Sequence, residues 1–279
     1  MKLAAILGHP VAHSLSPAMH NAAFAALDMD WAYMPVDVLP ADLPGVVDRL
    51  RAFRWRGASV TVPHKQAVMP LLDEVTHEAE AVGAVNTIVR QRDRLVGENT
   101  DWQGFLVPLR ESGFDISGQR CVVLGAGGAA RAIVYALGRA GATTITVFNR
   151  TLSRANDLIH DLQPEIPAVT LRGRSLAAMA NLVATSAPSL VVNTTSVGMW
   201  PETNGCPWPD DLPIPSPAVV YDLVYNPLNT RLLQRAEEAG CRTVDGVGML
   251  VHQGAVAFKM WTGREPPVEV MYEAVRSLL

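Results

Sequence analysis

The chain has 279 residues, 49% of them hydrophobic and 18% charged, with a formal net charge of −4 at pH 7. This length allows two domains with a core each, and the weakly acidic charge without a basic tract excludes nucleic acid as an expected partner. No apolar run approaches the ~20 residues that span a bilayer. Cys121, Cys206 and Cys241 are an odd, scattered set. We interpret them as reduced thiols of a cytosolic protein, not as a disulfide framework or metal site.

The first hundred residues alternate strand and helix patterns. The apolar start breaks at Gly8-His9-Pro10, which favours a buried first strand over a signal peptide. Strands are expected over 3–7, 33–38, 57–62, 84–89 and 94–97, with the last two forming a hairpin. Helices are expected over 17–27, 43–53 and 64–72, the first with Ser16 as its cap and Pro17 at its first position. This alternation predicts an α/β sheet of mostly parallel strands.

The second part continues the alternation. A helix over 102–111 leads to strands over 121–124, 144–148, 190–193, 218–223 and 242–244. The proline-rich stretch 200–217 has no apolar period and is expected as a surface loop. Helices over 248–261 and 267–279 end the chain, and the sequence leaves open whether they return to the first domain.

A glycine-rich turn lies at the centre of the second part. Gly125, Gly127 and Ala130 follow a β-branched strand and open an alanine-rich helix, in the G-x-G-x-x-G/A spacing of dinucleotide-binding sites. The glycines permit a tight turn close to a pyrophosphate, and the helix start offers free N–H groups. Such turns also occur for structural reasons alone. The adjoining strand, helix and second strand favour a nucleotide site.

The end of the second strand indicates which nucleotide binds. NAD-binding proteins place a carboxylate there against the ribose 2′-hydroxyl. This chain has Asn149-Arg150-Thr151, with Arg154 one turn later. Two guanidinium groups suit a 2′-phosphate, which predicts NADP. The alternative is a solvated basic turn that caps the next helix at Thr151.

Polar residues of the first part fall at strand ends. Ser14 and Ser16 stand at a helix start, where hydroxyl and N–H groups suit a carboxylate; plain capping by Ser16 is the alternative. Lys65 follows an apolar strand, and partial desolvation there suits proton transfer. Asp101 lies at the domain junction, where it could pair with Lys65. The alternative is that Lys65 is an ordinary surface lysine, which is the commoner case. His64 is a rival acid or base.

The amides of Asn86 and Gln253 suit a polyhydroxylated ligand, and ordinary polar positions at element edges are the alternative reading. The sequence contains no internal repeat and no low-complexity segment.

Taken together, the motifs resemble the shikimate/quinate dehydrogenase family along essentially the whole chain. The segments that carry the resemblance, in the family's order, are 13–17, 59–65, 83–87, 99–101, 125–129, 149–151, 222–225 and 245–253. The resemblance implies an α/β fold of two domains with a cleft between them. A substrate-binding and catalytic domain would comprise 1–101 plus 249–279, and a Rossmann-type NADP-binding domain 102–248.

The resemblance also implies an activity, the reversible NADPH-dependent reduction of 3-dehydroshikimate to shikimate. Lys65 and Asp101 look like the catalytic pair. The substrate carboxylate would be held by Ser14, Ser16 and Tyr225, and its hydroxyls by Thr61, Lys65, Asn86, Asp101 and Gln253. NADP(H) would contact Gly125, Ala126, Gly127, Gly128, Ala129, Asn149, Arg150, Thr151, Arg154, Thr195, Leu223, Gly246 and Met249. The partner is thus a small-molecule substrate, with no metal, nucleic acid or membrane, and the oligomeric state, a homodimer included, stays open.

Two features depart from the family pattern. Ser59 stands where the family often has Asn, and the loop after Met199 is long and rich in tryptophan. Two alternative functions remain. One is a sibling enzyme acting on quinate, often with NAD, or on an aminated analogue. The other is a nucleotide-binding sensor with a retired site, which the presence of Lys65, Asp101, Asn86 and Gln253 disfavours.

Overall fold

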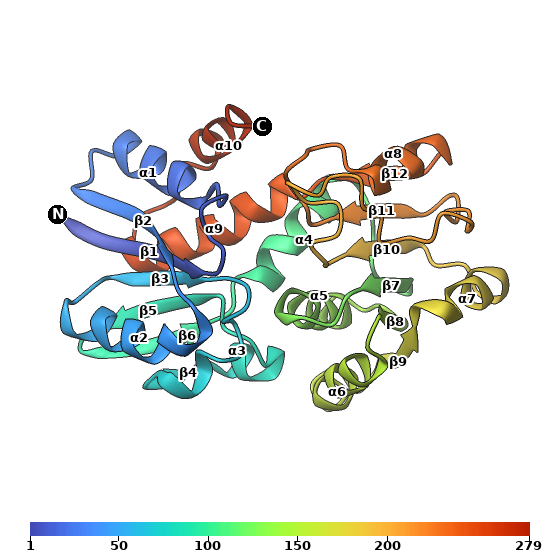
Figure 1. Cartoon of the computed structure of the whole chain (residues 1–279), viewed down its shortest axis with the longest axis horizontal. Helices are drawn as coiled ribbons and strands as arrows, with labels where there is room; N and C mark the ends of the chain where they lie inside the picture. The colour runs from blue at the N-terminus through green and yellow to red at the C-terminus, as the bar shows by residue number, and fades with distance from the viewer. The chain divides into compact units, whose positions relative to one another are not determined.

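The computed structural model describes all 279 residues, apart from the side chain of Val183. The chain folds into two compact units, one of Met1–Gly104 with Leu250–Leu278 and one of Phe105–Met249 with Leu279. The chain passes from the first unit to the second within helix α4 (Asp101–Glu111) and back within helix α9 (Val247–Thr262) (Figure 1). Among the described residues, no helix is both long and apolar enough to cross a membrane.

The first unit is built on a six-stranded mixed sheet in the order β2-β1-β3-β5-β6-β4. Its strands are β1 (Lys2–Gly8), β2 (Trp31–Asp37), β3 (Gly57–Val60), β4 (Glu74–Val75), β5 (Thr87–Gln91) and β6 (Arg94–Glu98). Its helices, besides the C-terminal part of α9, are α1 (Ser16–Ala26), α2 (Leu43–Ala52), α3 (His77–Val82) and α10 (Val268–Arg276). The pairs β1–β2, β1–β3 and β4–β6 are parallel, and β5 is antiparallel to β3 and β6. The expected hairpin and the mostly parallel sheet are therefore confirmed.

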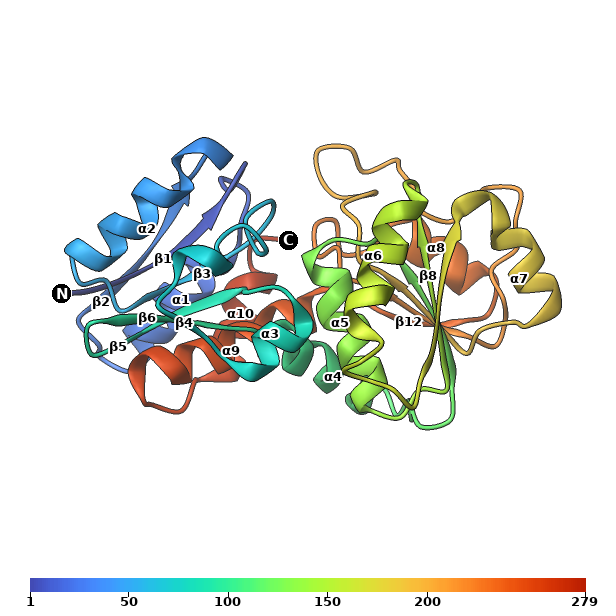
Figure 2. The ribbon, with the colours of Figure 1, turned by 90° about the horizontal axis from the view of Figure 1, so that it is seen from below.

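Each face of this sheet is covered by different helices. The α2 side chains Leu43, Val47 and Leu50 join a buried cluster with β1, β3 and β5. On the other side, an aromatic cluster of α1, β2 and α9 contains His20, Phe24, Tyr33, Phe258 and Trp261. Figure 2 shows α2 on one side of the sheet and α1, α9 and α10 on the other. The last helices therefore belong to the first unit, a point that the sequence left open.

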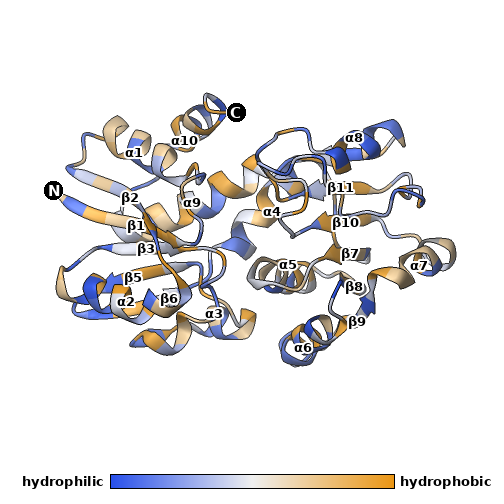
Figure 3. Ribbon diagram, in the orientation of Figure 1, coloured by the Kyte–Doolittle hydropathy of each residue, from blue (hydrophilic) through white to orange (hydrophobic). Residues whose placement is uncertain are grey.

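The second unit is a parallel sheet in the order β12-β11-β10-β7-β8-β9. Its strands are β7 (Arg120–Leu124), β8 (Thr144–Asn149), β9 (Thr170–Ser175), β10 (Leu190–Asn193), β11 (Val219–Asp222) and β12 (Arg242–Val244). Helices α5 (Gly128–Arg139) and α6 (Leu152–Leu162) cover one face, and α7 (Met179–Thr185) and α8 (Arg231–Glu238) the other (Figure 2). The strand order is that of the Rossmann fold, with the topological switch between β7 and β10. Figure 3 shows the apolar residues concentrated on the central strands, as expected for sheets covered on both faces.

Two expectations about local structure are wrong. Residues 64–72 form turns and a short 3₁₀ segment, Met69–Leu71, and not a helix. Pro63 and Pro70 bracket too few residues for a stable helix, and Pro70 has no N–H to continue one. Ser16 is the first residue of α1 and not its cap, because Leu15 holds the N-cap position without a side-chain bond.

The proline-rich stretch is irregular, as expected, but it does not lie only on the surface. Trp208 is 1% exposed and packs with Val191, Val220 and Leu232 under the α8 face of the sheet. The Arg235 guanidinium of α8 donates to the carbonyls of Trp208 and Leu212, each at 3.0 Å. A single buried indole and one arginine thus fix a loop that has no regular structure.

Candidate active site

The topology of the first unit collects polar residues at one edge of its sheet. The chain leaves β1 toward Ser14 and Ser16, leaves β3 toward Thr61 and Lys65, and leaves β6 toward Asp101. Strand β5 runs in the opposite direction, so Asn86, just before it, lies at the same edge; the Val60 N–H donates to the Asn86 carbonyl at 2.7 Å. Ligands of open α/β sheets bind at such an edge.

Lys65 and Asp101 form an ion pair at this edge. Lys65 Nζ donates to Asp101 Oδ2 at 2.5 Å, and the two side chains are only 13% and 5% exposed. Asp101 is in the first turn of α4, where the helix N-terminus favours a negative charge. An ammonium carries three protons, and Asp101 is the only acceptor of Lys65 among the side chains the structure describes. Two protons of Lys65 are therefore available to a bound ligand.

Asn86 holds the other oxygen of Asp101. Its Nδ2 donates to Asp101 Oδ1 at 2.8 Å and to Thr100 Oγ1 at 2.9 Å, and its Oδ1 accepts from the Thr100 N–H at 2.7 Å. Gln253 Oε1 lies 3.4 Å from the same Nδ2. These bonds bring together four of the residues expected at the substrate, Lys65, Asn86, Asp101 and Gln253, although they are far apart in the sequence.

The remaining polar side chains differ in how many of their hydrogen-bonding groups already have partners in the protein. Ser14 Oγ accepts from the Ser16 N–H at 3.3 Å, and the Ser16 hydroxyl has no partner among the described residues. A Cβ on Gly8 would collide with the Thr61 methyl, so these two residues are tightly packed. His64 is buried, and its Nε2 donates to the Val38 carbonyl at 2.7 Å. His64 is thus occupied by the backbone, which disfavours it as the rival acid or base.

In the second unit the glycine-rich turn joins β7 to α5. Gly125 has φ 110°, a conformation that favours glycine, and a Cβ there would meet Thr194 Oγ1 at 2.6 Å. Gly127 is the N-cap of α5 and makes no side-chain cap bond, and the space where its Cβ would lie is open. No side chain caps the first N–H groups of α5, and the space beside Gly127 is open. This arrangement fits the pyrophosphate of a dinucleotide.

The basic turn after β8 has free cations. Arg150 and Arg154 are exposed, and neither guanidinium has a hydrogen-bond or ion-pair partner within the described part of the chain. The Asn149 amide donates to the Thr151 carbonyl at 2.9 Å, which shapes the turn. Thr151 is the N-cap of α6, but its hydroxyl makes no cap bond, contrary to the alternative of a simple capping turn. Two unpaired guanidinium groups beside the turn suit a phosphate.

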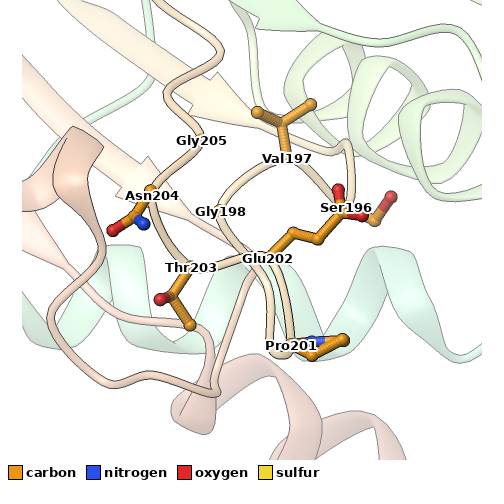
Figure 4. A pocket seen from close by; sticks show the side chains of 8 residues that line it. All are labelled: Ser196, Val197, Gly198, Pro201, Glu202, Thr203, Asn204 and Gly205. Carbon is orange, nitrogen blue, oxygen red and sulfur yellow. The ribbon is translucent and has the colours of Figure 1, made fainter.

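The residues expected on the nicotinamide side follow the ends of β10, β11 and β12. Thr195 follows β10, Leu223 follows β11, and Gly246 precedes α9, where the absence of a Cβ leaves room for the Leu223 carbonyl. Tyr225 and Met249 lie in the same unit. A hollow of about 670 Å³ opens directly after Thr195 and is lined by residues 196–198 and 201–205, including Glu202 and Asn204 (Figure 4).

The sequence reasoning missed a buried polar cluster of Asn193, Asp222 and Thr230, which binds the Thr195 turn. The signal was present, because Asn193 and Asp222 end adjacent strands at the ligand-binding edge. No group of three His, Cys, Asp or Glu residues among those described could hold a metal ion.

Three family models match the chain. "Shikimate dehydrogenase substrate binding domain" matches residues 6–88, "Shikimate / quinate 5-dehydrogenase" residues 109–207, and "Shikimate 5'-dehydrogenase C-terminal domain" residues 246–276. Together these models cover the greater part of both units.

Relatives and solved structures agree with the models. A shikimate dehydrogenase (NADP(+)) of Moorella thermoacetica is 50% identical over 99% of this chain and 93% of its own length. A shikimate 5-dehydrogenase of Thermus thermophilus, solved with NADP(H) and shikimate, is 40% identical over all of both chains with a TM-score of 0.87. A quinate dehydrogenase of Corynebacterium glutamicum with NAD is 33% identical over 99% of both chains with a TM-score of 0.89. The fold is therefore shared by enzymes of both substrates.

Proposed function

Since the chain belongs to the shikimate dehydrogenase family, we propose that Lys65 and Asp101 carry its reaction, the reversible NADPH-dependent reduction of 3-dehydroshikimate to shikimate. The observation that supports these roles is the shielded pair itself, a lysine held by a buried carboxylate with two protons left over. The surrounding amides offer donors and acceptors for a polyhydroxylated ring.

Bound NADPH supplies a hydride, with its two electrons, to C3 of the ketone. The Lys65 ammonium gives a proton to the C3 oxygen as negative charge develops there, and becomes a neutral amine. Asp101 holds Nζ in place and balances its positive charge, and the neutral Asn86 amide fixes the orientation of the Asp101 carboxylate. In the direction of oxidation, neutral Lys65 takes the proton from the C3 hydroxyl.

The remaining substrate contacts are assigned from the sequence motifs. The Ser14 and Ser16 hydroxyls, at the N-terminus of α1, would hold the carboxylate together with Tyr225. Thr61, Asn86 and Gln253 would bind the ring hydroxyls. Gln253 Nε2 donates to the Leu250 carbonyl at 2.8 Å, and its Oε1 is directed toward the Asn86 amide.

The basic turn supports selection of NADP over NAD. The open turn at Gly127 fits the pyrophosphate, and the unpaired Arg150 and Arg154 fit the 2′-phosphate. We expect the double substitution Arg150→Ala and Arg154→Ala to raise the KM for NADP⁺ by about 100-fold or more, because charge-assisted bonds to a phosphate are worth roughly 1.5–3 kcal/mol each. The KM for NAD⁺ should stay close to that of the wild type. Arg139→Ala, an arginine at the end of α5 in the same unit, is the matched control.

The experiment that tests the function offers shikimate or quinate to the purified enzyme, each with NADP⁺ or NAD⁺, and follows the absorbance of reduced nicotinamide. Strong turnover only with shikimate and NADP⁺ is expected. Comparable rates with NAD⁺ would contradict the role of the basic turn. Turnover of quinate at similar rates would place the enzyme with the sibling class, and no turnover with any pair would overturn the proposal.

The three cysteines are free thiols, and burial raises the pKa of Cys121 to about 12. Free thiols support a working place in the reducing cytoplasm.

A further inference from the structure

Asp222, at the end of β11, is a buried carboxylate without a cation. It is 0% exposed, and none of the described side chains forms an ion pair with it. Instead three neutral groups donate to it. Asn193 Nδ2 and the Val224 N–H reach Oδ1 at 2.8 and 3.0 Å, and the Thr230 hydroxyl reaches Oδ2 at 2.7 Å. Burying an unpaired carboxylate is expensive, so this arrangement calls for a reason beyond packing.

Two of the bonds lead to the ends of strands that face the ligand edge. Asn193, also 0% exposed, uses its amide nitrogen on Asp222 and its amide oxygen on Thr195. That oxygen accepts from the Thr195 N–H at 3.0 Å and from the Thr195 hydroxyl at 2.7 Å. Because Asp222 only accepts, it dictates which end of the Asn193 amide faces Thr195. The orientation of Asn193 in turn holds the Thr195 hydroxyl inward, and Thr195 Oγ1 accepts from the Val197 N–H at 3.2 Å.

The third bond leads elsewhere. Thr230 is the N-cap of α8, and its hydroxyl oxygen accepts from the Leu233 N–H at 3.3 Å. This arm reaches a helix on the outer face of the sheet and touches no residue of the expected cofactor site. One carboxylate therefore serves two separable arms, and only the Asn193 arm reaches the nicotinamide side.

We infer that Asp222 and Asn193 are positioning residues for the nicotinamide half of the cofactor, acting through the main chain and hydroxyl of Thr195. The inference rests on the proposed function, since it takes Thr195 as a cofactor contact. Neither residue touches the ligand or takes part in the chemistry. Without the Asn193 link Thr195 loses its two bonds to the end of β10, and its position beside the nicotinamide ring is no longer fixed. The neighbouring Thr194 stays bonded to the Leu124 carbonyl, and the adenosine half, at the Arg150 turn, is unaffected.

A purely structural role predicts something different. It would lower the melting temperature of every variant in the cluster and leave the kinetics of the folded enzyme unchanged. Two variants separate these explanations. Asn193→Leu keeps the branching and the number of heavy atoms of the side chain but removes the arm to Thr195, and Thr230→Val removes only the arm to α8. Asp222→Asn is the conservative rescue. Its oxygen can still accept from Asn193 and Val224 while its nitrogen donates to Thr230.

The experiment measures kcat and KM for NADP⁺ with shikimate in the full-length enzyme, the inhibition constant of adenosine 2′,5′-bisphosphate, and the melting temperature. For Asn193→Leu we expect kcat/KM for NADP⁺ to fall about tenfold or more, with the inhibition constant within twofold of wild type. Thr230→Val should melt at a lower temperature with kinetics within twofold, and Asp222→Asn should keep kcat/KM within about threefold.

The inference would be overturned by wild-type kcat/KM for NADP⁺ in Asn193→Leu. It would also be overturned by a loss of kcat/KM in Thr230→Val as large as the loss in Asn193→Leu. An equal loss of bisphosphate binding in Asn193→Leu would do the same, because the defect would then not be confined to the nicotinamide half. An inactive wild-type enzyme would instead refute the proposed function, so the two failures are distinguishable.

Discussion

Each unit has buried polar groups at the ligand-binding edge of its own sheet, but the buried charges are compensated in different ways. In the first unit Lys65 and Asp101 neutralise one another, and the lysine retains free protons that face the ligand edge. In the second unit Asp222 has no cation among the described side chains, and three neutral donors use its oxygens from inside the protein. A charge pair that keeps unused donors suits chemistry, whereas a charge that is enclosed suits the fixing of loops. Burial alone therefore does not distinguish the two kinds of group, whereas unused hydrogen-bonding capacity does.

Removing the Lys65 ammonium, the group with unused protons, is the strongest test of this comparison. Lys65→Ala should lower kcat by about 10³-fold or more, because a general acid contributes typically 10²–10⁴-fold and Asp101 is left without its partner. Binding of NADP⁺, measured by fluorescence or calorimetry, should stay within about twofold. Lys259→Ala, which breaks the exposed pair with Glu265, is the matched control and should keep full activity. Near-normal turnover of Lys65→Ala would rule out Lys65 as the proton donor.

The buried carboxyl group of Asp222 should make the stability of the protein depend on pH. Burial raises the pKa of Asp222 from 3.8 to about 6, against the opposing effect of its three donors. The folded protein then holds a proton that the unfolded chain releases, so this group stabilises the fold below pH 4 and its contribution is lost as the pH rises through 6. The loss amounts to about 3 kcal/mol.

Asp222→Asn cannot titrate, so the variant should gain stability relative to wild type as the pH rises from 4 to 7. Thermal unfolding of both proteins across this range measures the difference. Parallel curves would show that the carboxylate titrates normally and that its enclosure is looser than the structure indicates.

The first unit offers the opposite case in His20. Both ring nitrogens are buried without a hydrogen-bond partner among the described residues, and the ring stacks on Tyr33 at 4.5 Å. Burial lowers the pKa of His20 from 6.5 to about 3. The unfolded chain therefore takes up a proton that the folded protein does not, and stability is lost as the pH falls below 6.5, by about 2 kcal/mol at pH 5.

His20→Leu should remove this acid sensitivity. We expect the melting temperature of the variant, relative to wild type, to be higher at pH 5 than at pH 8. An unchanged difference between the two pH values would mean that water or a rearrangement satisfies the ring.

The sequence predicted the secondary structure best where periodicity and turn chemistry agree. The strand–glycine turn–helix at 121–139 was found because Gly125 must adopt a conformation that other residues avoid. The edge strand β9 was missed because Thr170–Ser175 contains two arginines and a glycine, and only Leu171 is buried. The segment 64–72 was misread because its apolar spacing resembles a helix, while Pro63 and Pro70 decide against one.

The candidate site divides in the same way. Lys65, Asn86, Asp101 and Gln253 could be named from motifs, and the roles assigned to them remain predictions. The pairing of Lys65 with Asp101 was anticipated from the sequence. The bonds of Asn86 to Asp101 and Gln253 were not, because they depend on an antiparallel strand that brings Asn86 to the edge where the parallel strands end. The Asn193–Asp222–Thr230 cluster was missed because its residues belong to three separate segments, and its only signal was that Asn193 and Asp222 end adjacent strands.

The return of α9 to the first unit has a consequence for how the protein is made. Trp261 Nε1 donates to the Ile88 carbonyl at 2.9 Å, and a Cβ on Gly57 would collide with the same indole. This ring therefore packs directly on strands β3 and β5 of the first unit. On the ribosome, residues 1–104 emerge first but lack Trp261 and the helices that follow Met249. The inserted unit, continuous from Phe105 to Met249, has all its strands available earlier. Synthesis therefore imposes an order in which the domain encoded in the middle can mature while the one encoded at both ends waits for the last segment of the nascent chain.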